Sequence, residues 1–117
     1  MASEGFHEQP QDLTPQTRDM HRAITSLMEE LEAVDWYQQR IDATTDDALR
    51  TILTHNRDEE KEHASMVLEW IRRHDPVFDT NLRKYLFTTE PITEQADETS
   101  PSEAAVSQKS GGRRWNG

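Results

Sequence analysis

The stretch LRTILTHNRDEEKEHASMVLEWI, residues 49–71, decides the fold because apolar side chains recur in it at helical spacing. At about 100° per residue, one face of a helix collects six apolar residues: Leu49, Ile52, Leu53, Val67, Trp70 and Ile71. With Leu49 at zero, Glu60 falls at about +20°, Asn56 at about −20° and His63 at about −40°, inside this apolar stripe. The stretch therefore predicts a long amphipathic helix with ionisable groups on its apolar face.

Those ionisable groups need a partner. A carboxylate removed from water without a partner costs several kcal/mol or becomes protonated. Glu60 and His63 are three residues apart, so their side chains meet on one side of the helix and can hold the same cation. A lone Glu-x-x-His on a solvent-facing surface is common and mostly without function. A hydrogen-bonded register device at a helical dimer interface is another structural explanation.

An earlier helix supplies a third candidate ligand. Thr14 and Pro15 are typical of a helix start, as N-cap and first helical residue, and we expect the helix to run to about Arg40. Its apolar face consists of Met20, Ile24, Leu27, Leu31 and Val34. With Leu27 at zero, Glu30 lies at about −60°, at the border of the apolar stripe, and can reach the interior where Glu60 and His63 converge.

Counting ligands predicts a dimer. A di-iron four-helix bundle takes a Glu from each of two helices and a Glu-x-x-His from each of the other two. This chain has one of each, on two long helices, which make half a bundle. A twofold dimer would supply four helices, four carboxylates and two imidazoles around two metal ions.

The two long helices are separated by a short link. The second begins near Thr45, the expected N-cap, and ends before Pro76. A connection of a few residues, 42–45, makes an antiparallel hairpin. Residues 79–87 predict a short third helix. The expected fold is all-α, a two-helix hairpin with a short C-terminal helix, dimerising into a ferritin-like four-helix bundle.

Composition favours a small acidic protein that oligomerises. Only 32% of the 117 residues are hydrophobic and 31% are charged, which is little for a monomeric core. A net charge of −10 argues against nucleic acid as a partner. The absence of cysteine excludes disulfides, zinc–thiolate sites and iron–sulfur clusters. No apolar run has the length of a membrane span, and no secretory signal is evident, so we expect a soluble intracellular protein.

Composition also divides the chain. Residues 1–13 are polar and irregular and predict a flexible N-terminus. Residues 14–87 form the expected helical half-bundle domain. Residues 88–117 are rich in Thr, Ser, Glu and Gly and predict a disordered tail, preceding or containing a segment that targets a partner.

Four segments resemble the encapsulated ferritins of bacteria. They are Met28–Tyr37 (MEELEAVDWY), His55–Ala64 (HNRDEEKEHA), Lys84–Thr88 (KYLFT) and Glu90–Thr93 (EPIT). The resemblance covers roughly residues 17–93, which takes in the whole predicted helical region. It implies a two-helix ferritin-like protein whose ferroxidase centre forms at a dimer interface, and five such dimers in a decameric ring.

The resemblance also implies an activity and a location. Such rings oxidise iron(II) to iron(III) with dioxygen, as cargo inside an encapsulin nanocompartment of the bacterial cytoplasm, where the shell stores the iron. Two iron ions would occupy each dimer interface, and calcium or zinc could take their place. Carried over by motif, the ferroxidase ligands are Glu30, Glu60 and His63. An outer metal site on the path of incoming iron would use Glu29 and Glu32, with Trp36 beside it and Tyr37 near the di-iron centre.

The end of the chain departs from this pattern. The family usually ends in a short apolar peptide that docks to the shell, whereas this chain closes SGGRRWNG, residues 110–117. Either the chain ends just before that peptide or its docking differs.

From the ligand set and the resemblance, we expect a ferroxidase. The alternative is a non-catalytic helical oligomer that binds calcium or zinc, and a third reading is a helical adaptor whose tail recruits a partner.

Overall fold

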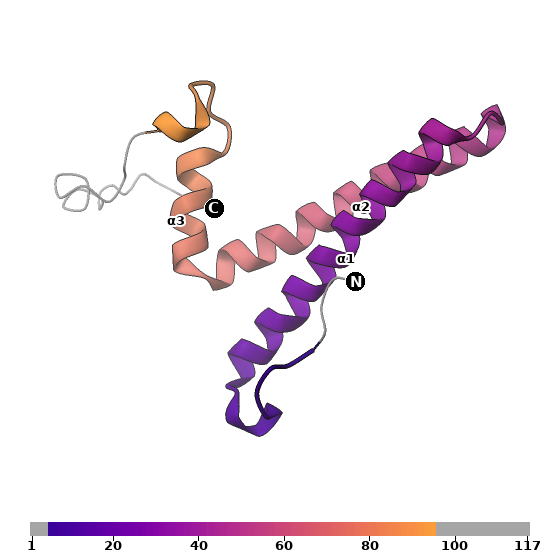
Figure 1. Ribbon diagram of the computed structural model, residues 1–117. Helices are drawn as coiled ribbons and strands as arrows, with labels where there is room; N and C mark the ends of the chain where they lie inside the picture. Colours follow the sequence, from indigo (N-terminus) through magenta and orange to yellow (C-terminus); the bar gives the residue numbers. More distant parts are fainter. Residues whose placement is uncertain (1–4, 96–117) are drawn as a thin grey trace. The chain divides into compact units, whose positions relative to one another are not determined.

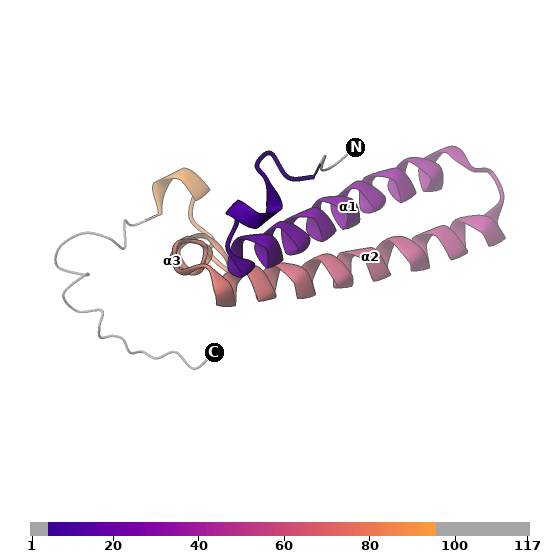
Figure 2. The same cartoon turned by 90° about the horizontal axis from the view of Figure 1, so that it is seen from below.

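The computed structural model describes residues 5–95 and is built from helices, with no strand in that range. The long helices are α1, Pro15–Ala43, and α2, Asp47–His74, followed by α3, Pro76–Tyr85. Two short 3₁₀ turns, η1 and η2, span Pro10–Asp12 and Ile92–Glu94. Helices α1 and α2 run antiparallel and lie side by side, which confirms the expected hairpin (Figure 1, Figure 2).

Helix α1 begins where the sequence indicated. The Thr14 Oγ1 accepts a hydrogen bond from the Thr17 backbone N–H at 3.0 Å, and Pro15 occupies the first helical position. The preceding segment is tied to the same helix, because Arg18 Nη1 donates to the carbonyl oxygens of Pro10 and Leu13, at 2.9 and 2.6 Å. The helix runs to Ala43, three residues beyond the expected end near Arg40.

The link between the long helices is shorter than predicted, and its cap is a different residue. It comprises residues 44–46, and Asp46 Oδ1 accepts from the Leu49 N–H at 2.9 Å, so Asp46 rather than Thr45 caps α2. Arg50 reaches back to the end of α1, where its Nε donates to the Ile41 carbonyl at 3.3 Å and its Nη2 to the Thr44 carbonyl. These bonds satisfy carbonyl groups that a helix end leaves free.

Helix α3 starts three residues earlier than expected. Pro76 ends α2, as predicted, but it is also the first residue of α3. Asp75 caps that helix, with Oδ1 accepting from the backbone N–H groups of Val77 and Phe78 at 3.0 and 2.9 Å. The helix ends at Tyr85 because Leu86 is extended and Phe87 has a left-handed φ of 62°.

The chain divides into two units, Met1–His74 and Asp75–Gly117. The division into 1–13, 14–87 and 88–117 stays a prediction, and most of the expected tail lies outside the described residues. Within residues 88–95, Gln95 Nε2 donates to the carbonyls of Glu90 and Pro91 at 3.1 and 3.0 Å. No helix among the described residues is long and apolar enough to cross a membrane.

The hairpin leaves much of its apolar surface uncovered. Within residues 5–95, only Ile41, Ala64 and Ile71 are buried. Leu49 and Ile52, from the stripe that predicted α2, are 45% and 55% exposed. Further exposed apolar side chains of the long helices are Ile24, Met28, Leu31, Trp36 and Met66. Two helices can cover only part of each other's apolar faces, so these surfaces are available to further helices.

Candidate metal centre

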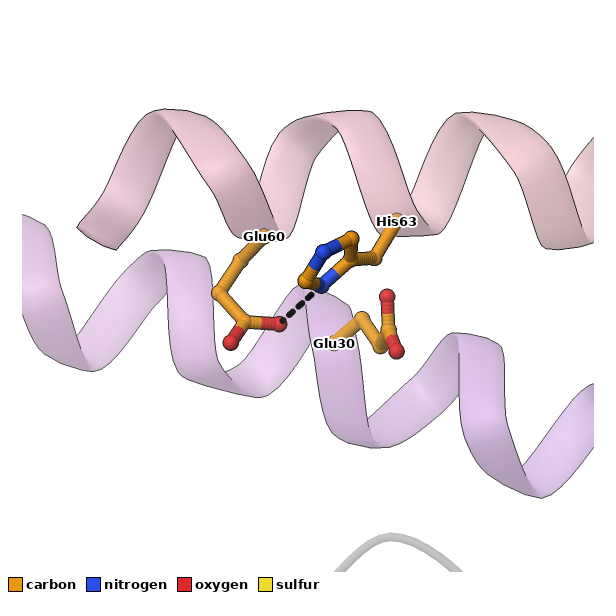
Figure 3. A group of neighbouring side chains, drawn as sticks. All are labelled: Glu30, Glu60 and His63. Atoms are coloured by element: carbon orange, nitrogen blue, oxygen red, sulfur yellow. Dashed lines mark ion pairs between the residues drawn. The ribbon is translucent and has the colours of Figure 1, made fainter. Parts of the chain in front are cut away.

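Three potential ligands converge midway along the hairpin. Glu30 extends from α1, and Glu60 and His63 extend from α2, so that one ligand atom of each lies within 4.8 Å of the others (Figure 3). Within the described part of the chain, no other group of three or more His, Asp or Glu side chains comes together in this way. The structure thus brings together the three residues expected to act as ligands.

Glu60 and His63 meet because helical spacing puts them one turn apart. The His63 Nδ1 lies 3.6 Å from Glu60 Oε1. The Glu60 side chain is 27% exposed and the His63 side chain 44% exposed, so the pair borders the surface of the hairpin. The separation is too long for a strong hydrogen bond. Both side chains therefore keep lone pairs available for a cation.

Glu30 is the least satisfied member of the triad. Its Oε1 is buried and accepts no hydrogen bond from any group in residues 5–95. Desolvation raises the pKa of the Glu30 carboxyl above its usual value, and the nearby negative charges of Glu60 and Glu29 also raise this pKa while His63 lowers it. A cation placed between Glu30 and Glu60 would remove both the desolvation cost and the mutual repulsion of the carboxylates.

The donor set suits a first-row transition metal. Two carboxylates and one imidazole combine hard oxygen ligands with a nitrogen ligand that binds iron in either oxidation state. His63 ligates only as the neutral imidazole, so binding depends on pH. Three ligands are fewer than the four to six that such ions take. A single chain therefore offers an incomplete coordination shell that water or a second chain must complete.

The residues expected at the outer metal site lie on α1 but outside the triad. Glu29 is exposed, Glu32 is half-buried and Trp36 is 49% exposed. Tyr37 is half-buried, and the Arg40 guanidinium carbon lies 5.5 Å from the centre of its ring. The outer site stays a prediction, because one chain does not test an arrangement that is expected in the assembled protein.

Sequence reasoning missed an interhelical hydrogen bond near the triad. Arg57 Nη1, on α2, donates to Gln38 Oε1, on α1, at 2.6 Å. Arg57 lies at about +80° on the helical wheel when Leu49 is at zero, at the edge of the apolar stripe. A long charged side chain at such an edge, three residues before Glu60, was the signal that could have identified it.

The chain is similar to known proteins along most of its length. A model of the protein family described as EncFtn-like matches residues 5–89. An encapsulated ferritin-like protein of Rhodospirillum rubrum is 60% identical over 92 residues, which are 79% of this chain and 66% of that protein. The aligned part is thus just under two thirds of that relative's length.

Two further comparisons agree with this match. An encapsulin nanocompartment cargo protein of Myxococcus xanthus is 36% identical over 93 residues, which are 75% of this chain and 72% of that protein. A crystal structure of a Nitrosomonas europaea protein superposes with a TM-score of 0.74 and 64% sequence identity, and covers 76% of this chain and 98% of that one. The chain belongs to the EncFtn-like family.

Proposed function

We propose that this chain is a ferroxidase that oxidises iron(II) to iron(III) with dioxygen at a centre formed between two copies of the chain. The observation that carries the proposal is the triad, where ligand atoms of Glu30, Glu60 and His63 lie within 4.8 Å of one another and the buried Glu30 Oε1 accepts no hydrogen bond within the described range. Iron(II) is the substrate, and two ions bound together can each give one electron to the same dioxygen molecule.

The small number of ligands in one chain favours a site shared between two chains over a site within one chain. It supplies three ligands, and His63 is 44% exposed at the surface of the hairpin. Apolar side chains on the same helix are also uncovered, at Leu49, Ile52 and Met66. A second copy would cover apolar surface and double the ligand set to four carboxylates and two imidazoles. In this arrangement the two chains would share the ions through Glu60, and Glu30 and His63 of each chain would hold one ion, which supplies an electron to dioxygen.

The remaining parts of the proposal rest on the family. Glu29 and Glu32 form an outer site for incoming iron, with Trp36 beside it and Tyr37 close to the di-iron centre. Dimers assemble into a decameric ring, and the ring works as cargo inside an encapsulin shell in the bacterial cytoplasm, where the shell stores the iron. Support for the shell comes from relatives whose names describe an encapsulated ferritin-like protein and an encapsulin cargo protein.

The test is the rate of iron(II) oxidation in air. We expect Glu30→Ala, Glu60→Ala and His63→Ala each to abolish most of the rate. Matched controls come from an exposed pair on α2, His55 and Glu59. Their Nε2 and Oε2 atoms are 3.1 Å apart. His55→Ala and Glu59→Ala remove the same residue types and should leave the rate unchanged. Equal rates in the three triad variants and the wild type would contradict the proposal.

Oxygen consumption separates this function from the alternative, a metal-binding helical oligomer without turnover. Both predict that the triad binds zinc or iron(II), because carboxylates and an imidazole suit both ions, whereas calcium would use the carboxylate oxygens alone. Iron(II) also reacts slowly with dioxygen in buffer, so only a ferroxidase consumes dioxygen faster than the same iron(II) without protein. Tight iron(II) binding by the wild type with oxygen uptake no faster than this background would therefore favour the alternative.

A further inference from the structure

We propose that Gln38 and Arg57 are positioning residues, whose hydrogen bond between α1 and α2 holds the Glu30–Glu60–His63 site in shape before metal arrives. This inference rests on the proposed metal-binding function and deepens it. The bond is the 2.6 Å contact between Arg57 Nη1 and Gln38 Oε1. Neither residue is expected to ligate metal, and both would act through the three ligands.

Without metal, the negative charges of the site favour separation of α1 from α2. Glu30 and Glu60 come from different helices, and their carboxylate oxygens lie within the 4.8 Å span of the triad (Figure 3). Two ionised carboxylates at that separation repel each other, and the repulsion is stronger where water is partly excluded. Glu60 and His63 belong to the same helix, so their contact does nothing to hold α1 against α2. The buried side chains of Ile41, Ala64 and Ile71 help to hold the hairpin together, and a polar attraction between the helices near the site would offset this local repulsion.

The hydrogen bond between Gln38 and Arg57 is well placed to supply that attraction. Arg57 precedes Glu60 by three residues, about 4.5 Å along α2, and Gln38 follows Glu30 by eight residues, about 12 Å along α1. The bond therefore lies between the triad and the link at residues 44–46, on the link side of the site. At the link, Arg50 already fixes the end of α1 through the carbonyls of Ile41 and Thr44.

The two side chains are themselves held in place. Arg57 Nε and Nη2 lie 3.0 and 2.9 Å from Asp58 Oδ1, and the Arg57 side chain is only 19% exposed. Gln38 Nε2 donates to Asp42 Oδ1 at 3.0 Å, which orients the amide so that its oxygen faces Arg57. Four side chains are thus linked in a series of hydrogen bonds, Asp42–Gln38–Arg57–Asp58. Only the central bond joins α1 to α2. A charged donor on a partly buried acceptor is among the stronger protein hydrogen bonds.

A double-mutant cycle on the 117-residue chain tests the inference, with cobalt(II) as the probe of the site. We expect Gln38→Ala and Arg57→Gln each to weaken cobalt(II) binding about tenfold, the lower end of the range for residues that orient ligands. Because both act through one bond, the double variant should lose about as much as either single variant. The visible absorption of bound cobalt(II) should change in the same three variants, since it reports ligand geometry.

Ile71→Val is the control for a simple loss of stability. Ile71 is 1% exposed on α2 and lies on the side of the triad away from Arg57, so this variant loosens the hairpin without touching the hydrogen bond. At 25 °C it should bind cobalt(II) within about twofold of the wild type. Arg57→Lys, which keeps the charge and one donor nitrogen, should recover part of the affinity lost in Arg57→Gln.

Three results would overturn the inference. One is unchanged cobalt(II) affinity in both single variants, another is a double variant that loses the product of the two single effects, and the third is a wild type that binds no cobalt(II). Iron oxidation is measured separately. A wild type that shows the expected coupling but does not oxidise iron(II) would contradict the ferroxidase proposal and leave the role of Gln38 and Arg57 intact.

Discussion

Two acid–base pairs of helix α2 share one spacing and have opposite outcomes. Glu60 and His63 are three residues apart, and so are Glu69 and Arg72. At the second pair, Glu69 Oε1 accepts from Arg72 Nε at 2.8 Å, and its Oε2 accepts from Arg72 Nη2 at 2.7 Å and from Arg73 Nε at 2.6 Å. At the first, the 3.6 Å contact leaves the carboxylate largely unsatisfied, and a second carboxylate, Glu30, faces it.

The carboxylates of the two sites have pKa values shifted in opposite directions. Hydrogen bonds from Arg72 and Arg73 lower the pKa of Glu69 to about 2. Burial and the neighbouring charge of Glu60 raise the pKa of Glu30. A carboxylate with a complete set of donors stabilises its helix, whereas carboxylates that repel each other indicate a place for a cation. Spacing alone therefore does not identify a site, and the partners on the facing helix decide.

The largest expected effect comes from neutralising one carboxylate in each place. Glu60→Gln should weaken iron(II) or cobalt(II) binding by at least about 100-fold, because a ligand is lost and not merely a group that orients one. Glu69→Gln should leave binding unchanged, since the arginines already satisfy that carboxylate. Titration of each variant of the 117-residue chain with cobalt(II) measures both effects. Equal losses in the two variants would show that general negative charge, and not the triad, attracts the metal.

Glu30→Gln should have an intermediate effect with opposite signs in the metal-free and metal-loaded protein. Because folding raises the pKa of Glu30, ionised Glu30 lowers the stability of the folded state. This loss of stability develops as pH rises from the usual pKa through the raised one. At neutral pH, the neutral amide should therefore raise the unfolding midpoint of the metal-free protein, by about 1–4 °C. It should also remove the further stabilisation that metal gives the wild type. Thermal unfolding with and without cobalt(II) measures both effects, and a destabilised metal-free variant would show that Glu30 is a structural residue.

The smallest effect is expected for Glu69→Gln, on the unfolding temperature and its change as pH falls. A pKa lowered to about 2 contributes stability that is present above the usual carboxyl pKa and is lost as pH falls towards 2. The Glu69 side chain is 42% exposed, so the loss of unfolding temperature at pH 7 should be no more than about 2 °C. The difference from the wild type should vanish near pH 2. A difference that grows in acid would contradict this assignment.

Helical periodicity predicted the triad because it depends on few variables. Each residue turns a helix by about 100°, so the positions of Glu30, Glu60 and His63 followed once two helices were recognised. The antiparallel hairpin followed from the short link. What periodicity does not contain is how far one helix slides along the other, which decides that Arg57 meets Gln38.

Local chemistry explains the errors at helix ends. Thr45 and Asp46 are both good N-caps, and the contact with the Leu49 N–H selects Asp46. Pro76 predicts the end of α2, but proline is also favoured in the first turn of a helix, and here it starts α3 after the Asp75 cap. The outer site of Glu29 and Glu32 stays a prediction, because it requires an assembly of several chains.

The central claim is that the metal site belongs to two chains. Native mass measurement of the 117-residue chain, titrated with iron(II) without oxygen, tests it most directly. We expect assemblies with even numbers of chains that gain two iron ions for each pair, and a shift to smaller species when a chelator removes the metal. Monomers that bind iron(II) with full affinity, or assemblies whose size and metal content are unrelated, would contradict it.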